Sequence, residues 1–465
     1  MTEKLSKHNF LMVAIIVVGG FVTILNQTVI SPALPSIMAK FSISAATGQW
    51  LTTIFMLVMG IMIPISAWLI GRFSTRQVFI AALGMFVCGT LLCALAPSFQ
   101  LLLIGRVLQA IGTGVQMPFV SVTVMQLFPK ERRGFALGIV GVVIGAAPAI
   151  GPTLSGYLVD ALGWRAIFWV TIPLAIILII LALIKLTNLT EAKAGKLDVL
   201  SVILSTLGFG GILLGASEAG DEGWLSALTI APLILGILIL IWFVRRQLKL
   251  KQPLLDVGLL KNGTLAVATA LSALVMAGMT VAAVVMPIYL QTLHHETALM
   301  SGLIMLPGAV LMAAMSPVSG KLFDRYGPKP LAITGLFLLA GGSLLLTFVK
   351  ADTSLIYLAA VYALRFFGIS LVNMPLTNWG INALLNHQIP HGNAIINTAR
   401  QVGGSIGSAV LVTVMTIASS GAPGGASVAG VNAAFTGTTI LMAVGFISAL
   451  IVFRRVKIGS SYDER

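Results

Sequence analysis

Three arginines stand inside long apolar stretches of the sequence: Arg106, Arg365 and Arg400. The 14 acidic residues fall instead in polar segments or at the edges of the apolar stretches. A charged side chain in lipid is costly, so an ionisable group there is by default a candidate for function. These guanidinium groups could bind anionic or hydrogen-bond-accepting parts of a ligand. Alternatively, Arg106 is structural and bonded to carbonyls of neighbouring helices, and Arg365 and Arg400 extend toward the membrane surface.

Two neutral amides, Asn26 and Gln27, lie in the stretch "ILNQTVISPALPSIM", near the end of the first apolar run. They predict hydrogen bonding in a cavity without a titratable charge. The alternative is that they bond this helix to its neighbours, which membrane amides do for about 1 kcal/mol or less. Because neither can take up a proton, Asp160 and Glu218, just past two later apolar runs, are the candidate proton-coupling residues.

Other polar side chains interrupt the apolar runs and are candidates for the lining of a central cavity. The predicted substrate-binding residues are Asn26, Gln27, Arg106, Gln109, Gln116, Asn373, Asn378, Trp379, Asn397 and Arg400. The methionines Met56, Met59 and Met62 predict either an adaptable cavity wall or ordinary contact with core and lipid. The sequence has no nucleotide-binding loop and no cluster with metal-ligand spacing, so neither a cofactor nor a metal is expected.

The composition indicates whether these residues lie in a soluble protein or in a membrane protein. Of the 465 residues, 58% are hydrophobic and 9% are charged, and the mean hydropathy is +1.03. A soluble domain of this length carries far more charge, so the sequence predicts an all-α, polytopic membrane protein. A membrane enzyme would need a nucleophile and base or a metal at the interface, and no such set is evident.

We predict fourteen transmembrane helices from the apolar runs. They cover approximately 10–31, 49–70, 78–96, 101–125, 134–158, 166–186, 199–216, 226–244, 265–290, 298–320, 330–349, 355–378, 393–418 and 434–453. Of the 28 basic residues, three lie deep in these spans and three in the loops on one side, namely Lys40, Arg165 and Lys350. The other 22 lie in loops or at span ends on the side of the termini. This asymmetry predicts cytoplasmic termini. The net charge of +14 therefore sets orientation and does not indicate a nucleic-acid partner.

An internal duplication divides the chain. "PISAWLIGRFSTR" from Pro64 pairs with "PVSGKLFDRYGPK" from Pro317, and "GRVLQAIGTGVQMP" from Gly105 has a looser counterpart in "LRFFGISLVNMP" from Leu364. We therefore predict a six-helix bundle over 1–190, two inserted helices with their loops over 191–262, a second six-helix bundle over 263–455 and a tail over 456–465. Parallel halves around a midplane cavity are typical of rocking secondary transporters.

With these features the sequence resembles the major facilitator superfamily, in particular its fourteen-helix drug/proton antiporters of the lincomycin-resistance and quaternary-ammonium-exporter type. The resemblance covers almost the whole chain. The loop motif G-x-L-x-D-R-x-G-x-K is intact at 320–329, whereas its first copy retains Arg72 and Arg76 but lacks the acid. The antiporter motif of the fifth helix is present at Gly141, Gly145, Gly151, Pro152 and Gly156. Many relatives carry Asp where this chain has Asn26, which puts a proton-carrying role of the first helix in doubt.

The resemblance implies gating roles for Asp324, Arg325, Arg72, Gly151 and Pro152. Asp324 and Arg325 would form an inner clamp between the bundles; the alternative is a solvated loop that only sets topology. The glycines around Gly151 would form a pliable seam that blocks leak; the alternative is ordinary small-residue packing.

The resemblance also implies a function, which is proton-coupled export of small amphipathic compounds by alternating access. We expect a monomer in the plasma membrane, in contact with lipids and protons. An exporter of lipids, fatty acids or other anionic amphiphiles is the alternative, with the arginines meeting anionic groups.

Overall fold

The computed structural model describes residues 7–128, 147, 150–188, 198–250, 253–385, 388–419 and 426–455. Within this part, thirteen helices are long and apolar enough to cross a membrane, and no strand is present. The predicted all-α membrane fold is therefore confirmed. The predicted span 134–158 falls partly outside the described residues; its described end is helical over residues 150–162, called helix 150–162 below.

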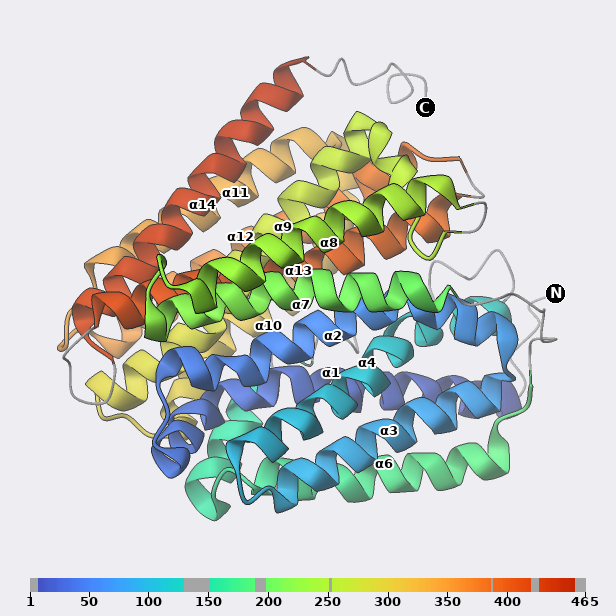
Figure 1. Cartoon of the computed structure of the whole chain (residues 1–465), viewed down its shortest axis with the longest axis horizontal. Helices are drawn as coiled ribbons and strands as arrows, with labels where there is room; N and C mark the ends of the chain where they lie inside the picture. Colours follow the sequence, from blue (N-terminus) through green and yellow to red (C-terminus); the bar gives the residue numbers. More distant parts are fainter. Residues whose placement is uncertain are drawn as a thin grey trace.

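Two groups of helices surround the centre of the molecule, and a helical pair lies between them in the view (Figure 1). We call the first group the N-half. It holds α1 (Lys7–Phe41), α2 (Ala45–Arg72), α3 (Thr75–Leu95), α4 (Phe99–Leu127), helix 150–162 and α6 (Ala166–Lys185). The second group, the C-half, holds α9 (Gly263–Ile288), α10 (Ala298–Tyr326), α11 (Pro328–Leu345), α12 (Leu355–Asn382), α13 (Ile389–Ala418) and α14 (Val428–Arg455).

The two halves repeat the same packing. In the N-half α4 packs against α1, α2 and α3, and α6 packs against α1 and α3. In the C-half α12 packs against α9, α10 and α11, and α14 packs against α9 and α11. The pairs correspond when α1, α2, α3, α4 and α6 are matched with α9, α10, α11, α12 and α14. This is the order that the duplicated sequence motifs predict, while the domain boundaries themselves stay predictions.

The inserted pair consists of α7 (Val199–Glu222) and α8 (Ala227–Lys249), joined by a tight turn at Gly223. α7 packs on α2 and α13, where the two halves meet, and α8 packs on α7. Gly211 and Gly236 let the two helices approach closely, because a methyl group at either position would meet backbone atoms of the other helix at 2.7–2.9 Å. Most of α8 is left on the outer surface of the molecule, with Leu228, Leu235 and Trp242 exposed.

α1 is longer than the sequence predicts. The span 10–31 was expected to end at Ser31-Pro32, but the helix continues through Pro32 and Pro35 to Phe41. A proline in a membrane helix is tolerated where neighbouring groups satisfy the freed backbone carbonyls. Pro32 and Pro35 free the carbonyls of Thr28 and Ser31. Donors from other helices hold the adjacent backbone in place: the Ser155 hydroxyl donates to the carbonyl of Val29, and Gln291 Nε2 donates to the carbonyl of Pro32 at 2.9 Å.

Local signals fix where several helices begin and end. Ser44, Ser74 and Ser98 cap the N-termini of α2, α3 and α4 through their hydroxyl oxygens. Gly327 ends α10 at φ +72°, and Pro328 then begins α11. Glycine adopts this backbone conformation readily, and proline suits a first helical turn. Gly327 and Pro328 therefore favour the turn between α10 and α11.

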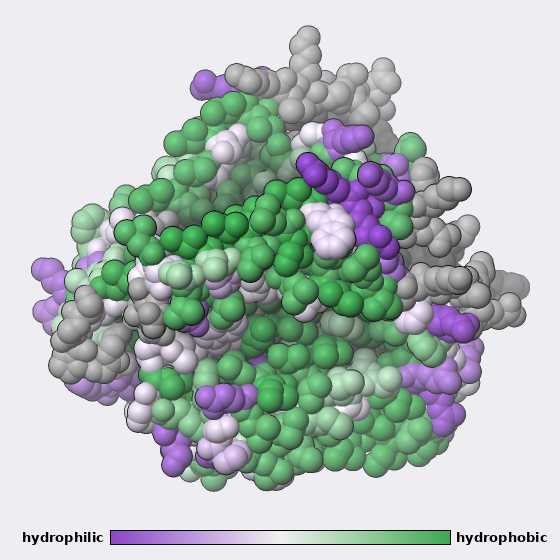
Figure 2. All heavy atoms as spheres, in the orientation of Figure 1, coloured by the Kyte–Doolittle hydropathy of each residue, from purple (hydrophilic) through white to green (hydrophobic). Residues whose placement is uncertain are grey.

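The surface agrees with a membrane environment. Hydrophobic side chains cover the middle of the face shown in Figure 2, and hydrophilic ones gather toward the ends of the helices. Large exposed apolar residues occur on both halves and on the inserted pair, among them Leu183 of α6, Leu238 of α8 and Phe337 of α11. The chain therefore presents an apolar belt that suits lipid.

An ion pair joins the start of α7 to the end of α8. Arg246 on α8 donates to both carboxylate oxygens of Asp198, which precedes α7, at 2.9 and 2.8 Å. Ser201 also donates to this carboxylate. These hydrogen bonds, that of Arg246 above all, hold the pKa of Asp198 below its usual value of 3.8.

The Asp198–Arg246 pair gives a first prediction. A lowered pKa means that the pair stabilises the fold above about pH 4 and that this contribution is lost as the pH falls through the lowered pKa. Since both side chains are partly exposed, we expect Asp198→Asn to lower the free energy of unfolding by less than about 1 kcal/mol near pH 6 and by a smaller amount near pH 3. Thermal unfolding in detergent at both pH values measures this. Asp256→Asn is the control, and an equal effect of both substitutions at pH 6 would contradict the assignment.

Candidate functional site: buried arginines and a central cavity

Arg106 of α4 is fully buried in the N-half and is held by neutral acceptors. Its Nη1 donates to Asn26 Oδ1 at 2.7 Å and to Gln109 Oε1 at 2.9 Å, and its Nε donates to the carbonyl of Leu51 at 3.0 Å. Phe55 lies under the guanidinium, whose carbon is 4.1 Å from the ring centroid. Asn26 is therefore the side chain through which α1 binds this cation.

No carboxylate neutralises Arg106 among the described residues. Gln109 passes the network on to α3 by donating from Nε2 to Thr90 Oγ1 at 2.9 Å. Two donors in this cluster, Arg106 Nη2 and Asn26 Nδ2, are buried without a partner. A buried cation stabilised only by dipoles keeps its charge in the bundle and attracts electronegative groups.

Arg365 of α12 is the counterpart of Arg106 in the C-half. It is also buried, and it donates from Nη2 to the carbonyl of Gly278 at 2.8 Å and from Nε to Ser343 Oγ at 3.1 Å. Its Nη1 has no partner. The alternative in which Arg365 extends toward the membrane surface does not hold, because the side chain turns inward to α9 and α11.

The two arginines preserve the duplication at the level of single residues. Each binds a backbone carbonyl of the first helix of its half, since Arg106 Nη1 also lies 3.4 Å from the carbonyl of Asn26 on α1. Thr90 and Ser343, the hydroxyl residues of the third helices, stand 253 positions apart, the offset of the loop motifs. We infer that both halves retain one design, in which a cation is held by uncharged acceptors.

A small cavity of about 60 Å³ lies between the halves. α1, α2 and helix 150–162 form one wall, and α9, α10 and α12 form the other. Its lining is Gln27, Thr28, Ser31, Thr52, Met56, Pro152, Met276, Met279, Thr280, Ala283, Met305, Tyr362 and Phe366. The wall thus combines four thioethers with hydroxyl groups and contains no carboxylate. In this conformation the cavity has room for a few waters, whereas pockets for drug-sized molecules measure about 300–1,000 Å³.

Hydrogen bonds between the halves close the side of the cavity away from the start of α1. Asp160, near the end of helix 150–162, accepts from the backbone N–H groups of Ala298 and Leu299 at 3.0 and 2.7 Å. Gln291 of the π-helical turn η3 (Tyr289–Leu293) reaches across to Pro32, as described above. The carboxylate meets the N-terminus of α10, where the helix dipole favours negative charge.

Two residues of the antiporter motif, Gly156 and Pro152, lie at this contact. Gly156 approaches the backbone of Ala298 closely, and Gly302 approaches the Pro152 carbonyl, with room for no larger side chain at either position. Gly151 packs against Thr28 within the N-half. The described part of the motif therefore joins the two halves, while Gly141 and Gly145 lie outside the described residues. Pliability of this seam stays a prediction.

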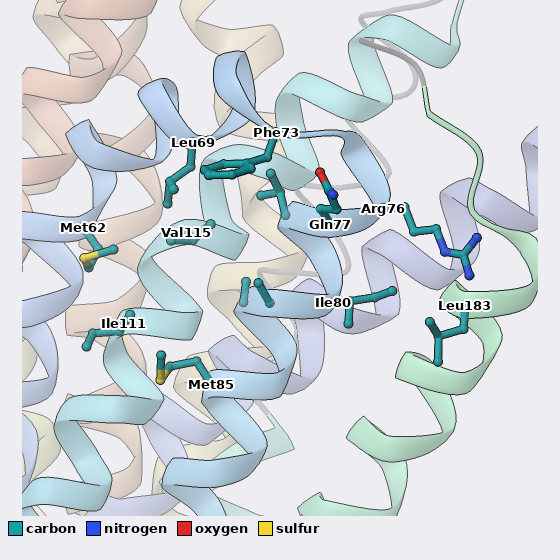
Figure 3. A pocket seen from close by; sticks show the side chains of 13 residues that line it. Met62, Leu69, Phe73, Arg76, Gln77, Ile80, Met85, Ile111, Val115 and Leu183 are labelled. Carbon is teal, nitrogen blue, oxygen red and sulfur yellow. The ribbon is translucent and has the colours of Figure 1, made fainter. Parts of the chain in front are cut away.

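A larger hollow of about 690 Å³ is lined by residues of the N-half alone. Figure 3 shows Met62 and Leu69 of α2, Ile111 and Val115 of α4 and Met85 of α3 around it. We call it the lateral groove. Met85 and Leu183 at its edge are exposed, so the groove opens on the apolar belt. Its walls belong to one half, and motion of the halves against each other would leave it unchanged.

The structure brings together only part of the predicted binding set. Asn26, Arg106 and Gln109 form one cluster, and Gln27 lines the central cavity. Gln116 is buried with its amide unpaired, near Gly19 of α1. Asn397 bonds to Asn393 on its own helix, and Trp379 packs on Phe453. The remaining members, Asn373, Asn378 and Arg400, are partly exposed and do not join the Arg106 cluster. Binding roles for all of them stay predictions.

In the described part of the protein, the predicted inner clamp forms no ion pair with the N-half. Asp324, Arg325 and Arg72 are exposed, and among the described residues the one ion pair is Asp198–Arg246. Arg325 lies over the ring of Tyr326. Glu218, one of the two candidate proton-coupling residues, lies on α7 beside a surface hollow of the inserted pair. The other, Asp160, joins the halves.

Comparison with known proteins places this architecture in a family. The family model of the Major Facilitator Superfamily matches residues 16–408. The chain belongs to this superfamily. It is 45% identical, over 96% of its length and 95% of the relative's, to the uncharacterized MFS-type transporter YcnB of Bacillus subtilis (strain 168). It is 38% identical to lincomycin resistance protein LmrB of the same organism, over 98% of both chains.

A more distant relative is also named for drug resistance. The multidrug resistance protein B homolog of Mycobacterium tuberculosis (strain ATCC 25618 / H37Rv) is 31% identical over 84% of this chain and 73% of its own length. The resemblance to drug exporters of the major facilitator superfamily is thus confirmed, and the chain is a multi-pass membrane transporter. Thr52, Tyr362 and the cavity methionines other than Met56 were not predicted as site residues, because no motif marks them.

The Arg106 cluster gives a second prediction. Asn26→Leu removes the closest acceptor of a buried cation and should lower the free energy of unfolding by about 1.5–3 kcal/mol. Asn26→Asp keeps an acceptor for Arg106 and should leave the protein at least as stable as the wild type. Thermal unfolding in detergent compares both with Asn397→Leu, which removes an amide bonded only to its own helix. Equal stability of Asn26→Leu and Asn397→Leu would contradict the proposed role.

The contact of Asp160 with α10 gives a third prediction. Asp160→Asn removes the charge that favours the helix N-terminus, worth about 0.3–1 kcal/mol, and should favour states in which this side is open. With Cys88 and Cys93 replaced by serine, a cysteine at Met305 should then react about two- to fivefold faster with a water-soluble thiol reagent applied from this side. Asp352→Asn, in a nearby exposed loop, is the control. Unchanged labelling in Asp160→Asn would rule out this latch.

Proposed function

We propose that this transporter exports small amphipathic compounds across the plasma membrane, with both termini in the cytoplasm, and that it works as a monomer driven by protons. The observation that carries the proposal is the central cavity, which both halves line and which has an apolar, thioether-rich wall with a few hydroxyls. Such walls adapt to varied ligands, because methionine is flexible and polarizable. The names of the relatives, lincomycin and multidrug resistance proteins, support the same substrate class.

The same geometry supports a mechanism of alternating access. A cavity of about 60 Å³ must enlarge to hold a substrate, and its walls belong to different halves. Rocking the halves apart on the side of the termini would admit a substrate while the Asp160 contact keeps the opposite side closed. Breaking that contact and closing the other side would then release the substrate outside.

Proton coupling needs a group that can change charge. The lining contains no carboxylate, and Asn26 cannot titrate. We propose Asp160 as the first candidate, because its carboxylate takes part in a contact between the halves, and Glu218 as the second. Export of anionic amphiphiles or lipids is the alternative substrate class, favoured by the two buried cations Arg106 and Arg365.

Proteoliposomes test the proposed function and give the fourth prediction. Purified protein is reconstituted with a pH-sensitive dye inside, and neutral, cationic and anionic amphiphiles of matched size are added. We expect substrate-dependent proton movement that an uncoupler abolishes. Asp160→Asn should uncouple or slow this movement, whereas Asp352→Asn should match the wild type. Transport that continues without a proton gradient and moves no protons would contradict the coupling.

A further inference from the structure

The central cavity contains two buried hydroxyl groups that bond to nothing in the described part of the protein. Tyr362 of α12 is fully buried and Thr52 of α2 is 5% exposed, and both line the cavity, from opposite halves. Neither hydroxyl has a hydrogen-bond partner. Leaving a buried hydroxyl unpaired costs about 1–3 kcal/mol, so such a group calls for a specific explanation.

Two other hydroxyls of the lining, in contrast, are satisfied within their own helices. Thr280 donates to the carbonyl of Met276 at 2.9 Å, and Thr28 donates to the carbonyl of Leu25, also at 2.9 Å. Threonines in helices satisfy themselves in this way as a rule. Thr52 could do the same and does not, and Tyr362 has no carbonyl on its own turn that its hydroxyl reaches. Both O–H groups are therefore free to donate to a guest.

The fixed charges near the cavity are cations. Arg365 lies one turn after Tyr362 on α12, with its Nη1 unpaired, and Arg106 binds Asn26, the neighbour of the lining residue Gln27. The lining itself adds no carboxylate. In a site of low dielectric, this arrangement favours the electronegative end of a guest and disfavours a second positive charge.

We propose that Thr52 and Tyr362 form a recognition site for a hydrogen-bond-accepting oxygen of the transported compound, such as a carbonyl, sulfonyl or carboxylate oxygen. The thioethers of Met56, Met276, Met279 and Met305 take up the apolar remainder. Because the two hydroxyls come from different halves, a guest that binds both ties the halves together. The preferred substrates are then neutral or anionic amphiphiles with an accepting oxygen, and dications bind weakly. This inference rests on the proposed function.

Matched ligands test the site. An aryl alkyl ketone and the corresponding aryl alkane differ only in the accepting oxygen, and a dicationic amphiphile of similar size is the third probe. Equilibrium binding to purified protein in detergent is measured by competition with a fluorescent amphiphile. For the wild type we expect the ketone to bind about tenfold more tightly than the alkane, and the dication to bind more weakly than the alkane.

Two substitutions distinguish recognition by the hydroxyls from a general change in ligand binding. Tyr362→Phe removes one hydroxyl and keeps the ring, and Thr52→Val keeps the shape of threonine. Each should reduce the ketone-to-alkane ratio to about threefold or less while the affinity for the alkane is unchanged. Tyr357→Phe is the matched control, since the hydroxyl of Tyr357 bonds to Leu345 on the exposed side of α12, and it should keep the tenfold ratio.

Different results bear on the inference and on the proposed function. A ratio near one in the wild type, or a tenfold ratio that survives both Tyr362→Phe and Thr52→Val, would overturn the inference. Export in proteoliposomes together with such a ratio would leave the proposed function standing without this site. A preserved binding preference without any export would support the site and contradict the proposed function.

Discussion

The structure depends on how two buried guanidinium groups are satisfied without an acid. Arg106 and Arg365 each sit in the middle of one half, and each is held by backbone carbonyls and neutral side chains of neighbouring helices. Inside the membrane, no bulk water can accept the hydrogen bonds of a guanidinium group. The surrounding helices must therefore lie where their carbonyl oxygens reach it. This requirement fixes α1 and α2 against α4, and α9 and α11 against α12. It also leaves a positive electrostatic potential beside the central cavity, and this potential limits which substrates can bind.

The same requirement explains the amides of the first helix. Asn26 is turned toward Arg106 and is 1% exposed, whereas Gln27, the next residue, faces the cavity. An aspartate at position 26 would therefore pair with Arg106 before it could meet a substrate, and its charge would be largely cancelled. Asn26→Asp should therefore add little to the recognition of cations. What sets the preference of the cavity is its own lining, which lacks carboxylates, together with the arginines behind it.

The sequence predicted the class of fold, the duplication and the buried arginines, because hydropathy, loop charge and repeated motifs are local signals. It could not predict that α1 continues past Pro32, since the hydrogen bonds from Ser155 and Gln291 that hold this segment come from other helices. Nor could it separate Asn26 from Gln27, because which face a helix turns to its neighbour depends on packing. Thr52 and Tyr362 remained unseen for another reason. Their hydroxyls lack a hydrogen-bond partner in the folded protein, and no sequence pattern indicates this.

The central cavity and the lateral groove are the two candidate substrate sites. A structure with a bound substrate distinguishes them most directly. The central cavity is small and belongs to both halves, while the lateral groove of α2, α3 and α4 is large and belongs to one. The protein should be solved with a saturating amount of an exported neutral amphiphile. We expect density between the halves, against Met56 and Tyr362, in a cavity enlarged to several hundred Å³. Density confined to the lateral groove, with the halves unmoved, would contradict the central cavity as the transport site.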